Sequence, residues 1–459
     1  MKRCNARAQA LRQALVAALG LWLAACTAVH VAGSGIGGGP LSTQAEGLIL
    51  VTVANPRGPV VTQPGSTPHG YDQAGAYAVS DAALGVAGAL EREYRLHRVR
   101  EWPIAPLRVH CLVFALPAHT DRSELLRRLS HDARVQLAQP LQLFASRTEP
   151  SAPGHADYTG DARSTSAAAP LYNDPYFGLQ SGFNAIQAAA AQRWSSGEGV
   201  SIAIVDTGVD LDHPDLAGRI EINANFIDQD RSGFQSDRHG TAVAGLIAAV
   251  ANNNVGIVGI APAARLQIYK ACEPEHRQAL EATCNSFTLA LALSAAIESH
   301  AQVVNLSLGG PPDPLLTQLV RYGEHQGMIF VGAVPEDGKR SGFPVGIEGV
   351  IAVDVSGHGR ASGILYAPGR DIVTLAPAAH YDFGSGSSFA TAHVTGAIAL
   401  LLARVPHLNA QQLQTVLAQT ESRANGAYSI NVCAALVALR PQDDCLHSTR
   451  SLAISGNQR

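Results

Sequence analysis

The sequence predicts a doubly wound α/β domain with a largely parallel sheet, preceded by a smaller α+β domain of ferredoxin-like order. From about residue 172, continuous apolar runs recur with helical patterns between them. Such runs are expected of strands buried on both faces of a parallel sheet. Residues 47–145 instead follow a β-α-β-β-α-β order, which is the ferredoxin-like arrangement. With 459 residues, the chain exceeds what one hydrophobic core usually serves.

The smaller domain is expected at residues 47–145. Its predicted strands are residues 48–53, 94–101, 108–116 and 135–144, and its predicted helices are residues 77–92 and 121–129. Thr120 is the expected N-cap of the second helix. Residues 146–171 are rich in Pro, Ser, Gly and Ala without apolar periodicity, which indicates a linker.

The larger domain is expected at residues 172–440, followed by a tail at 441–459. Its apolar runs predict strands at residues 199–206, 303–308, 328–331 and 350–353. Helical patterns lie near 240–251, 285–300, 312–326 and 388–404. Strands that alternate with helices favour a parallel, doubly wound sheet.

The first 25 residues have the pattern of an export signal. A basic segment precedes the apolar residues 14–25, which are too few to span a bilayer, because that takes ~20 apolar residues. The sequence Leu-Ala-Ala-Cys at 23–26 resembles a bacterial lipobox, which implies lipidation of Cys26. An ordinary secretory signal with a chance cysteine is the alternative. Thr27 after the cysteine resembles outer-membrane lipoproteins, and residues 26–46 are the expected tether.

Charge and cysteine content limit the partners. The net charge of −4 with no basic run predicts no nucleic-acid partner. Outside the cytoplasm, two cysteine pairs spaced 12 residues apart indicate loop-closing disulfides: Cys272 with Cys284, and Cys433 with Cys445. Metal binding is the alternative, but neither pair has a Cys-x-x-Cys or His spacing. Cys111 lies in an apolar run and is expected to be a buried thiol.

Three short motifs contain residues suited to nucleophilic catalysis. Asp-Thr-Gly stands at 206–208 after an apolar strand, His-Gly-Thr at 239–241 opens a helix, and Gly-Ser-Ser-Phe-Ala stands at 386–390 before an apolar helix. Each alone could be an ordinary strand end, helix start or turn. Together, in the order Asp, His, Ser, they resemble the subtilisin-like serine peptidases over about residues 172–440. The resemblance implies a triad of Asp206, His239 and Ser388 that hydrolyses peptide bonds through an acyl-enzyme.

The resemblance also extends to the substrate and ion sites. It implies a peptide-binding strand at Ser307, Leu308 and Gly309. Gly332 and Gly342 match residues that line the family's main specificity pocket, which would admit a sizeable apolar side chain. Structural calcium is implied through Asp215, Asn253, Val255 and Ile257, which offer oxygen donors. A solvated Asn-rich loop is the alternative to this calcium site.

The sequence departs from the family at the oxyanion position. Glu336 stands where the family places an asparagine donor, and a carboxylate would repel the developing oxyanion. This raises a second hypothesis, a catalytically impaired protein that serves as a binding or assembly module. The resemblance also implies that residues 47–145 are an inhibitor-like prodomain, with a plain structural domain as the alternative. Cleavage within residues 146–171 would then release the peptidase from its lipid anchor in the cell envelope.

Overall fold

The computed structural model describes residues 41–56, 77–146, 148–150, 171–228, 231–276, 279–357, 360–424 and 427–443. All of them belong to one compact unit, Gly38–Arg459. The predicted signal peptide, Cys26, Cys445 and most of the predicted linker lie outside the described residues. Within the described ranges, no helix has both the length and the apolar character needed to cross a membrane.

The smaller domain has the predicted ferredoxin-like order. A short 3₁₀ helix, η1 (Leu41–Gly47), precedes the elements β1 (Leu48–Ala54), α2 (Asp81–Tyr94), β2 (His97–Ile104), β3 (Val109–Ala115), α3 (Arg122–Ser130) and β4 (Val135–Pro140). The sheet order is β2-β3-β1-β4, and every neighbouring pair is antiparallel.

Two details of this domain differ from the prediction. The N-cap of α3 is Asp121 rather than Thr120, because the Asp121 carboxylate accepts the Glu124 N–H at 3.1 Å. The predicted last strand, residues 135–144, is wrong as a single element: β4 ends at Pro140, and β5 (Leu143–Ser146) joins a different sheet. Proline has no N–H to continue a ladder, and it stands where the chain leaves the sheet.

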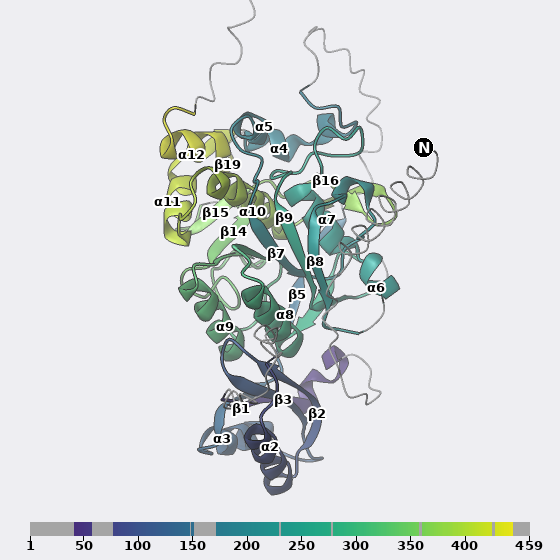
Figure 1. Cartoon of the computed structure of the whole chain (residues 1–459), viewed down its shortest axis with the longest axis vertical. Helices are drawn as coiled ribbons and strands as arrows, with labels where there is room; N and C mark the ends of the chain where they lie inside the picture. The colour runs from purple at the N-terminus through teal and green to yellow at the C-terminus, as the bar shows by residue number, and fades with distance from the viewer. Residues whose placement is uncertain are drawn as a thin grey trace, which may run out of the picture. The chain divides into compact units, whose positions relative to one another are not determined.

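The larger domain is built on a parallel sheet of seven strands, which confirms the α/β prediction (Figure 1). Its order is β15-β14-β13-β12-β7-β9-β8. The strands are β7 (Ser201–Asp206), β8 (Ile220–Asn225), β9 (Arg265–Lys270), β12 (Val303–Leu306), β13 (Ile329–Ala333), β14 (Ile351–Val355) and β15 (Ile364–Ala367). Side chains of β7 alternate between two cores, with Ile202 and Ile204 in one and Ala203 and Val205 in the other. Both faces of the sheet are therefore buried.

Helices cover both faces of this sheet. The long helix α10 (Ser387–Arg404) and α7 (Arg238–Ala248) pack into the core that contains Ile202, whereas α8 (Ser286–Glu298) and α9 (Pro314–His325) pack into the other core. The remaining helical elements are η2 (Phe177–Leu179), α4 (Ser181–Ala185), α5 (Ala188–Gln192), η3 (Pro214–Leu216), α6 (Arg231–Gln235), α11 (Ala410–Gln419) and α12 (Val432–Leu439). A hairpin of β18 (Ser422–Ala424) and β19 (Ala427–Ser429) lies between the last two helices in the sequence.

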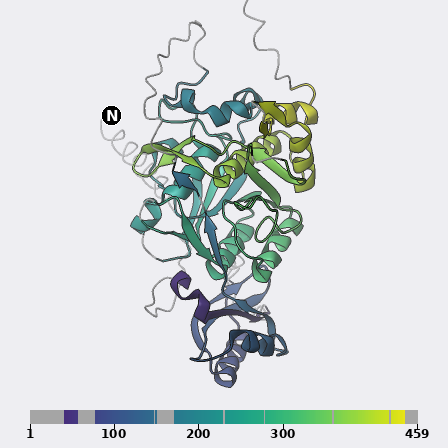
Figure 2. The same cartoon turned by 180° about the vertical axis from the view of Figure 1, so that it is seen from behind.

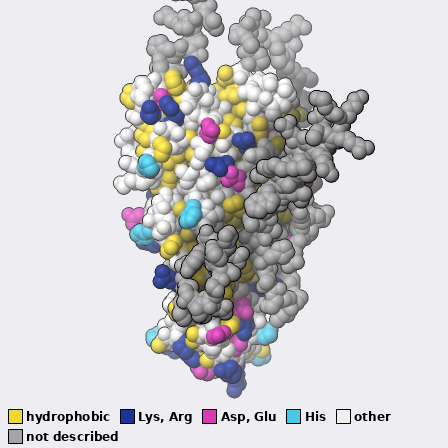
Figure 3. All heavy atoms as spheres, in the orientation of Figure 1, with side chains coloured by type: hydrophobic (Ala, Val, Ile, Leu, Met, Phe, Trp, Pro, Cys, Tyr) yellow, Lys and Arg dark blue, Asp and Glu magenta, His cyan; other side chains and the backbone are white. Residues whose placement is uncertain are grey.

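The small sheet is covered on both faces as well. One face packs on α2 and α3, while the other contributes Leu50, Val109 and Cys111 to the core that holds α8 and α9 (Figures 1 and 2). At this contact Gln139 donates to Asp313 Oδ2 at 2.7 Å and accepts the Leu315 N–H at 3.1 Å, at the start of α9. On the face shown in Figure 3, basic and acidic side chains are interspersed.

Two small sheets each receive a strand from the segment that follows the small domain. One has the order β10-β11-β5, from β10 (Cys272–Pro274), β11 (Ala282–Asn285) and β5. The other has the order β16-β17-β6, from β16 (Ile372–Ala376), β17 (His380–Ser385) and β6 (Glu149–Pro150). Residues predicted as a linker therefore begin as strands added to the larger domain.

Candidate active site

The structure brings Asp206 and His239 together. Asp206 is the last residue of β7, and His239 is the second residue of α7. His239 Nδ1 lies 2.7 Å from Asp206 Oδ1, and the two side chains are 0% and 2% exposed. The Thr207 N–H also donates to Asp206 Oδ1 at 2.7 Å. A carboxylate that accepts from Nδ1–H leaves Nε2 as the proton acceptor, which is the form a general base requires.

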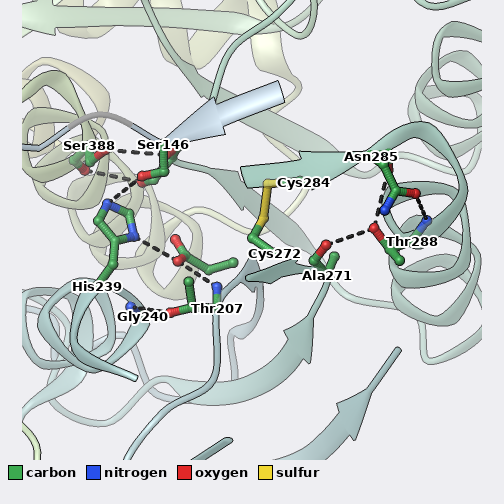
Figure 4. The surroundings of a disulfide bond; sticks show 12 residues. Ser146, Thr207, His239, Gly240, Ala271, Cys272, Cys284, Asn285, Thr288 and Ser388 are labelled. Carbon is green, nitrogen blue, oxygen red and sulfur yellow. Dashed lines mark hydrogen bonds and ion pairs between the residues drawn. A yellow bond between two sulfur atoms is a disulfide. The ribbon is translucent and has the colours of Figure 1, made fainter. Parts of the chain in front are cut away.

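Ser388 lies at the start of the long helix α10. It is the second residue of the helix, so its N–H is one of the four that have no partner within the helix. Its hydroxyl donates to the Ser307 carbonyl oxygen at 3.2 Å, and the Ser307 hydroxyl donates to the Ser388 carbonyl oxygen at 3.2 Å. Figure 4 shows Ser388 and His239 grouped with a third side chain, Ser146.

A segment of the chain itself occupies the position next to His239. Ser146 Oγ lies 2.7 Å from His239 Nε2, and Thr148 Oγ1 lies 3.1 Å from the same nitrogen. Ser146 ends β5, which pairs antiparallel with β11. On its other edge, Ala145 exchanges two backbone hydrogen bonds with Gly309, both 2.9 Å long. Strand β5 therefore lies between two backbones of the larger domain, as an extended peptide would.

Phe144 anchors this strand in an apolar pocket. Its side chain is 2% exposed, and its ring meets that of Phe343 edge-on, with centroids 5.4 Å apart. A Cβ at Gly310 would lie 2.5 Å from the Phe144 ring, so only glycine leaves room for it there. The neighbouring Leu143 is 38% exposed. Within β5, the larger domain therefore buries Phe144 and leaves Leu143 exposed.

The predicted Cys272–Cys284 disulfide is present and joins β10 to β11 (Figure 4). The strand that pairs with β5 is thus covalently fixed to its own neighbour. Cys433 is also disulfide-bonded, but its predicted partner Cys445 lies outside the described residues, so that pairing stays a prediction. Cys111 is a buried free thiol, and burial raises its pKa.

A buried ion pair behind the histidine was not predicted from the sequence. Lys270, the last residue of β9, pairs with Asp237, the residue before α7. Both side chains are at most 4% exposed, and Asp237 also accepts the Gly208 N–H at 2.6 Å. Burial raises the pKa of Asp237. A lysine that ends a buried strand is the only signal in the sequence that a buried acidic partner exists.

The four predicted calcium ligands lie together around Asp215. The buried Asp215 carboxylate accepts from Asn253 Nδ2 at 2.8 Å and from the Ile257 N–H at 2.9 Å. The Val255 N–H in turn donates to Asn253 Oδ1 at 2.8 Å. Burial raises the pKa of Asp215 to about 6. Within the described ranges, no group of three or more His, Cys, Asp or Glu side chains is arranged to hold a metal.

Asp174 is a further residue of this cluster that the sequence did not reveal. Its Oδ2 accepts the Asn252 N–H at 2.8 Å, while its buried Oδ1 has no hydrogen-bond partner. Its charge also raises the pKa of Asp215, as a secondary cause after burial, so the two carboxylates are near each other. An unpaired buried oxygen beside a second carboxylate fits a cation such as calcium.

The predicted pocket glycines have different roles in packing. Gly309 pairs with β5, whereas Gly342 has a φ of +72°, and a Cβ there would lie 2.1 Å from the Gly310 carbonyl oxygen. A Cβ at Gly332 would lie 2.5 Å from the Pro344 ring. Both of these glycines therefore allow close packing around the segment 342–345. Glu336, in the loop after β13, is exposed.

Comparison with known proteins agrees with this geometry. The model of the subtilase family matches residues 197–434. Thermitase of Thermoactinomyces vulgaris is 34% identical over 267 residues, which cover 55% of this chain and 92% of the relative. Subtilisin BL of Lederbergia lenta is 35% identical over 251 residues, which cover 52% and 90%.

A solved structure extends the likeness to the fold of most of the chain. Fervidolysin from Fervidobacterium pennivorans, a keratinolytic enzyme related to subtilisin, superposes with a TM-score of 0.65 and 22% identity. The match covers 85% of this chain and 60% of fervidolysin, so at this identity it concerns the fold alone. The family match spans the strand, helix and serine segments described above, and we conclude that the chain belongs to the subtilase family of serine peptidases.

Proposed function

We propose that the protein is an exported serine endopeptidase that uses Asp206, His239 and Ser388, and that residues 47–145 are its inhibitory prodomain. One observation carries the proposal. Strand β5 lies beside His239 in the backbone pairing of an extended peptide, with Ser146 and Thr148 on the two sides of one position. An extended peptide held from both edges is the form in which peptidases receive substrates.

The residues present support an acyl-transfer mechanism. Ser388 Oγ attacks the carbonyl carbon of the residue before the cut while His239 Nε2 takes its proton. His239 then gives that proton to the leaving amine as the C–N bond breaks, and Asp206 stabilises the imidazolium. Water hydrolyses the Ser388 ester by the same steps. The Ser388 N–H, which has no partner within α10 because it lies in the first turn, supplies one donor to the oxyanion.

Self-processing tests the proposal. We expect wild type from a secreting host to be cut after β5, and Ser388→Ala to stay full length. Removing the nucleophile costs on the order of 10⁶ in rate in a subtilisin. Intact mass and N-terminal sequencing report the cut, and a fluorophosphonate should label wild type and the neighbouring Ser387→Ala but not Ser388→Ala. Folded wild type that takes no label would favour a binding module, the role that a carboxylate at Glu336 would suit.

Export and anchoring remain part of the proposal. The signal-like residues 1–25 and Cys26 support a lipoprotein of the cell envelope, held in the outer membrane. A cut after β5 would separate the lipid from the peptidase. The intact mass of the amino-terminal fragment tests this, because acyl chains on Cys26 add to that mass. If the added mass is missing in Cys26→Ser, the acyl chains are assigned to Cys26.

Calcium is proposed as a structural ion at the cluster of Asp174 and Asp215. Oxygen donors of Asn253 and the carbonyls of Val255 and Ile257 would complete the shell. Bound calcium would lower the repulsion between the two carboxylates and raise stability. Chelator should therefore lower the unfolding temperature of wild type but not that of Asp215→Asn. An equal shift in both proteins would contradict the site.

A further inference from the structure

The buried ion pair of Lys270 and Asp237 has no part in the mechanism proposed above, although Asp237 stands two residues before His239. Both side chains of the pair are at most 4% exposed. Burying two charges costs free energy, and such a pair is often no more stable than two apolar side chains of similar volume. Stability alone therefore does not account for a lysine and an aspartate at these positions.

Asp237 takes part in hydrogen bonds that join the end of β7 to the start of α7. Each of the consecutive residues 206–208 makes one such contact: Asp206 Oδ1 with His239 Nδ1 at 2.7 Å, Thr207 Oγ1 with the Gly240 N–H at 3.0 Å, and the Gly208 N–H with Asp237 Oδ2 at 2.6 Å. Figure 4 shows the second contact beside His239. The turn after β7 is therefore fixed to the helix that carries His239, and Asp237 supplies the last of these contacts.

Lys270 connects a third element, strand β9, to the same place. It is the Cα partner of Asp206 in the parallel pairing of β7 with β9, and the next residue, Ala271, donates its N–H to the Asp206 carbonyl oxygen at 2.8 Å. The Lys270 side chain forms the ion pair with Asp237. Its ammonium group therefore extends from the strand beside Asp206 to the residue that precedes α7.

The charges of this place act on one another. Burial raises the pKa of Asp237, the Lys270 ammonium opposes that rise, and the charge of Asp206 adds to it. The two carboxylates are therefore close enough to repel each other. Asp206 also has one buried oxygen, Oδ2, with no hydrogen-bond partner among the described residues. The ammonium of Lys270 thus offsets the charge of a second buried carboxylate beside Asp206.

Further titratable groups lie on the elements around His239. Asp210, after β7, accepts two backbone N–H groups, and Arg238 pairs with the half-exposed Asp382. On α10, burial lowers the pKa of His393 to about 4, so its ring is neutral above that pH. Substitutions in the buried ion pair leave all of these groups in place.

We infer that Lys270 and Asp237 are a positioning pair for the proposed triad. Asp237 fixes the turn after β7 to the start of α7, and Lys270 cancels the negative charge that Asp237 brings there. The inference rests on the proposed function and adds two residues to its site. Without the ammonium, the second carboxylate would favour the imidazolium form of His239 and leave less of the neutral base. Without the carboxylate, the ammonium would disfavour the imidazolium that forms during attack.

The test measures how fast a fluorophosphonate labels processed full-chain protein, at a dilution at which peptidase activity has appeared. In this reaction Ser388 Oγ bonds to phosphorus, fluoride leaves and His239 takes the proton. The fall of the labelling rate toward acid pH therefore reports loss of the neutral histidine. Rates are compared from about pH 5 to about pH 9, the range in which histidine changes its charge.

Asp237→Asn keeps the shape of the side chain and an acceptor for the Gly208 N–H, but it removes the charge. We expect the midpoint of the acid limb to move to lower pH by about half a unit or more, because the imidazolium loses a nearby negative charge. The double variant Lys270→Met with Asp237→Asn should return the midpoint to within about 0.2 unit of wild type, since both charges are then gone. It is preferred to Lys270→Met alone, which would leave a buried carboxylate unpaired.

Glu221→Gln is the matched control. It breaks an exposed ion pair with Arg265, which lies on the same strand as Lys270, and should keep the wild-type midpoint. A pair that only stabilises the fold would change the unfolding temperature and leave the midpoint where it is. Folded Asp237→Asn with an unchanged or higher midpoint, or a double variant that keeps the shift of Asp237→Asn, would overturn the inference. Folded wild type that takes no label would instead refute the proposed function.

Discussion

The cleft holds the two strands of its occupying segment very differently. Strand β5 pairs over four residues with β11 and is bridged on its other edge by Gly309, and Phe144 is buried in a pocket. Strand β6 has two residues and, among the described strands, pairs with β17 alone. The side before the cut that we propose is therefore held from both edges, and the side after it from one. We expect the amino-terminal product to stay bound and the other end to leave.

The largest expected effect on how tightly the amino-terminal product is held comes from Phe144→Ala. Removing a buried aromatic ring costs about 3–5 kcal/mol in a protein core, so we expect retention of the cleaved fragment to weaken by about 100-fold or more. Retention of the fragment is measured as the dilution of the processed protein at which peptidase activity appears. Leu143→Ala is the matched control, because that side chain is 38% exposed. Equal effects of both substitutions would show that the pocket does not hold the fragment.

An intermediate effect is expected from Gln139→Ala. Its side chain makes two hydrogen bonds to the start of α9, and Asp313 would lose one of its partners there. A buried hydrogen bond to a charged group contributes about 1.5–3 kcal/mol, which predicts roughly 10-fold weaker retention or more. Gln142→Ala is the control, since Gln142 reaches Ser286 through its backbone, which the substitution keeps. The same dilution assay should leave Gln142→Ala within about twofold of wild type.

The smallest effect is expected from Glu149→Ala. Strand β6 is held by backbone pairing of two residues, which alanine preserves. The rate of self-processing, followed by intact mass over time, should stay within about twofold of wild type. A tenfold slower cut would mean that the residues after the bond are recognised through their side chains. Strands β5 and β6 would then not differ in the way described above.

Short motifs and strand order could be predicted from the sequence, whereas the occupied cleft could not. Asp206 and His239 stand in contiguous motifs, and the order of elements in residues 48–140 already specifies a ferredoxin-like sheet. The alternation of apolar residues, however, continues across Pro140, so the pattern predicted one strand where the structure has two. The pairing of β5 depends on residues more than 130 positions further along the chain, which local periodicity does not report.

Long-range pairing also explains the other omissions. Asp174 belongs to the cluster around Asp215 through Asn252, 78 residues away, and nothing in its own segment marks it. Thr120 and Asp121 can both cap a helix, so only the side-chain hydrogen bond to Glu124 identifies Asp121 as the cap. Residues that act through distant partners were therefore missed, whereas residues that carry their own motif were found.

The position of β5 on the same chain as the cleft has a kinetic consequence. While the chain is whole, the strand faces the site at an effective concentration in the millimolar range, typical of short covalent links, whatever the dilution of the protein. The cut that we propose would turn this into an ordinary bimolecular equilibrium, in which the fragment dissociates as the protein is diluted. The cut peptidase would then stay inhibited near the surface that holds its amino-terminal fragment and become active as it diffuses away.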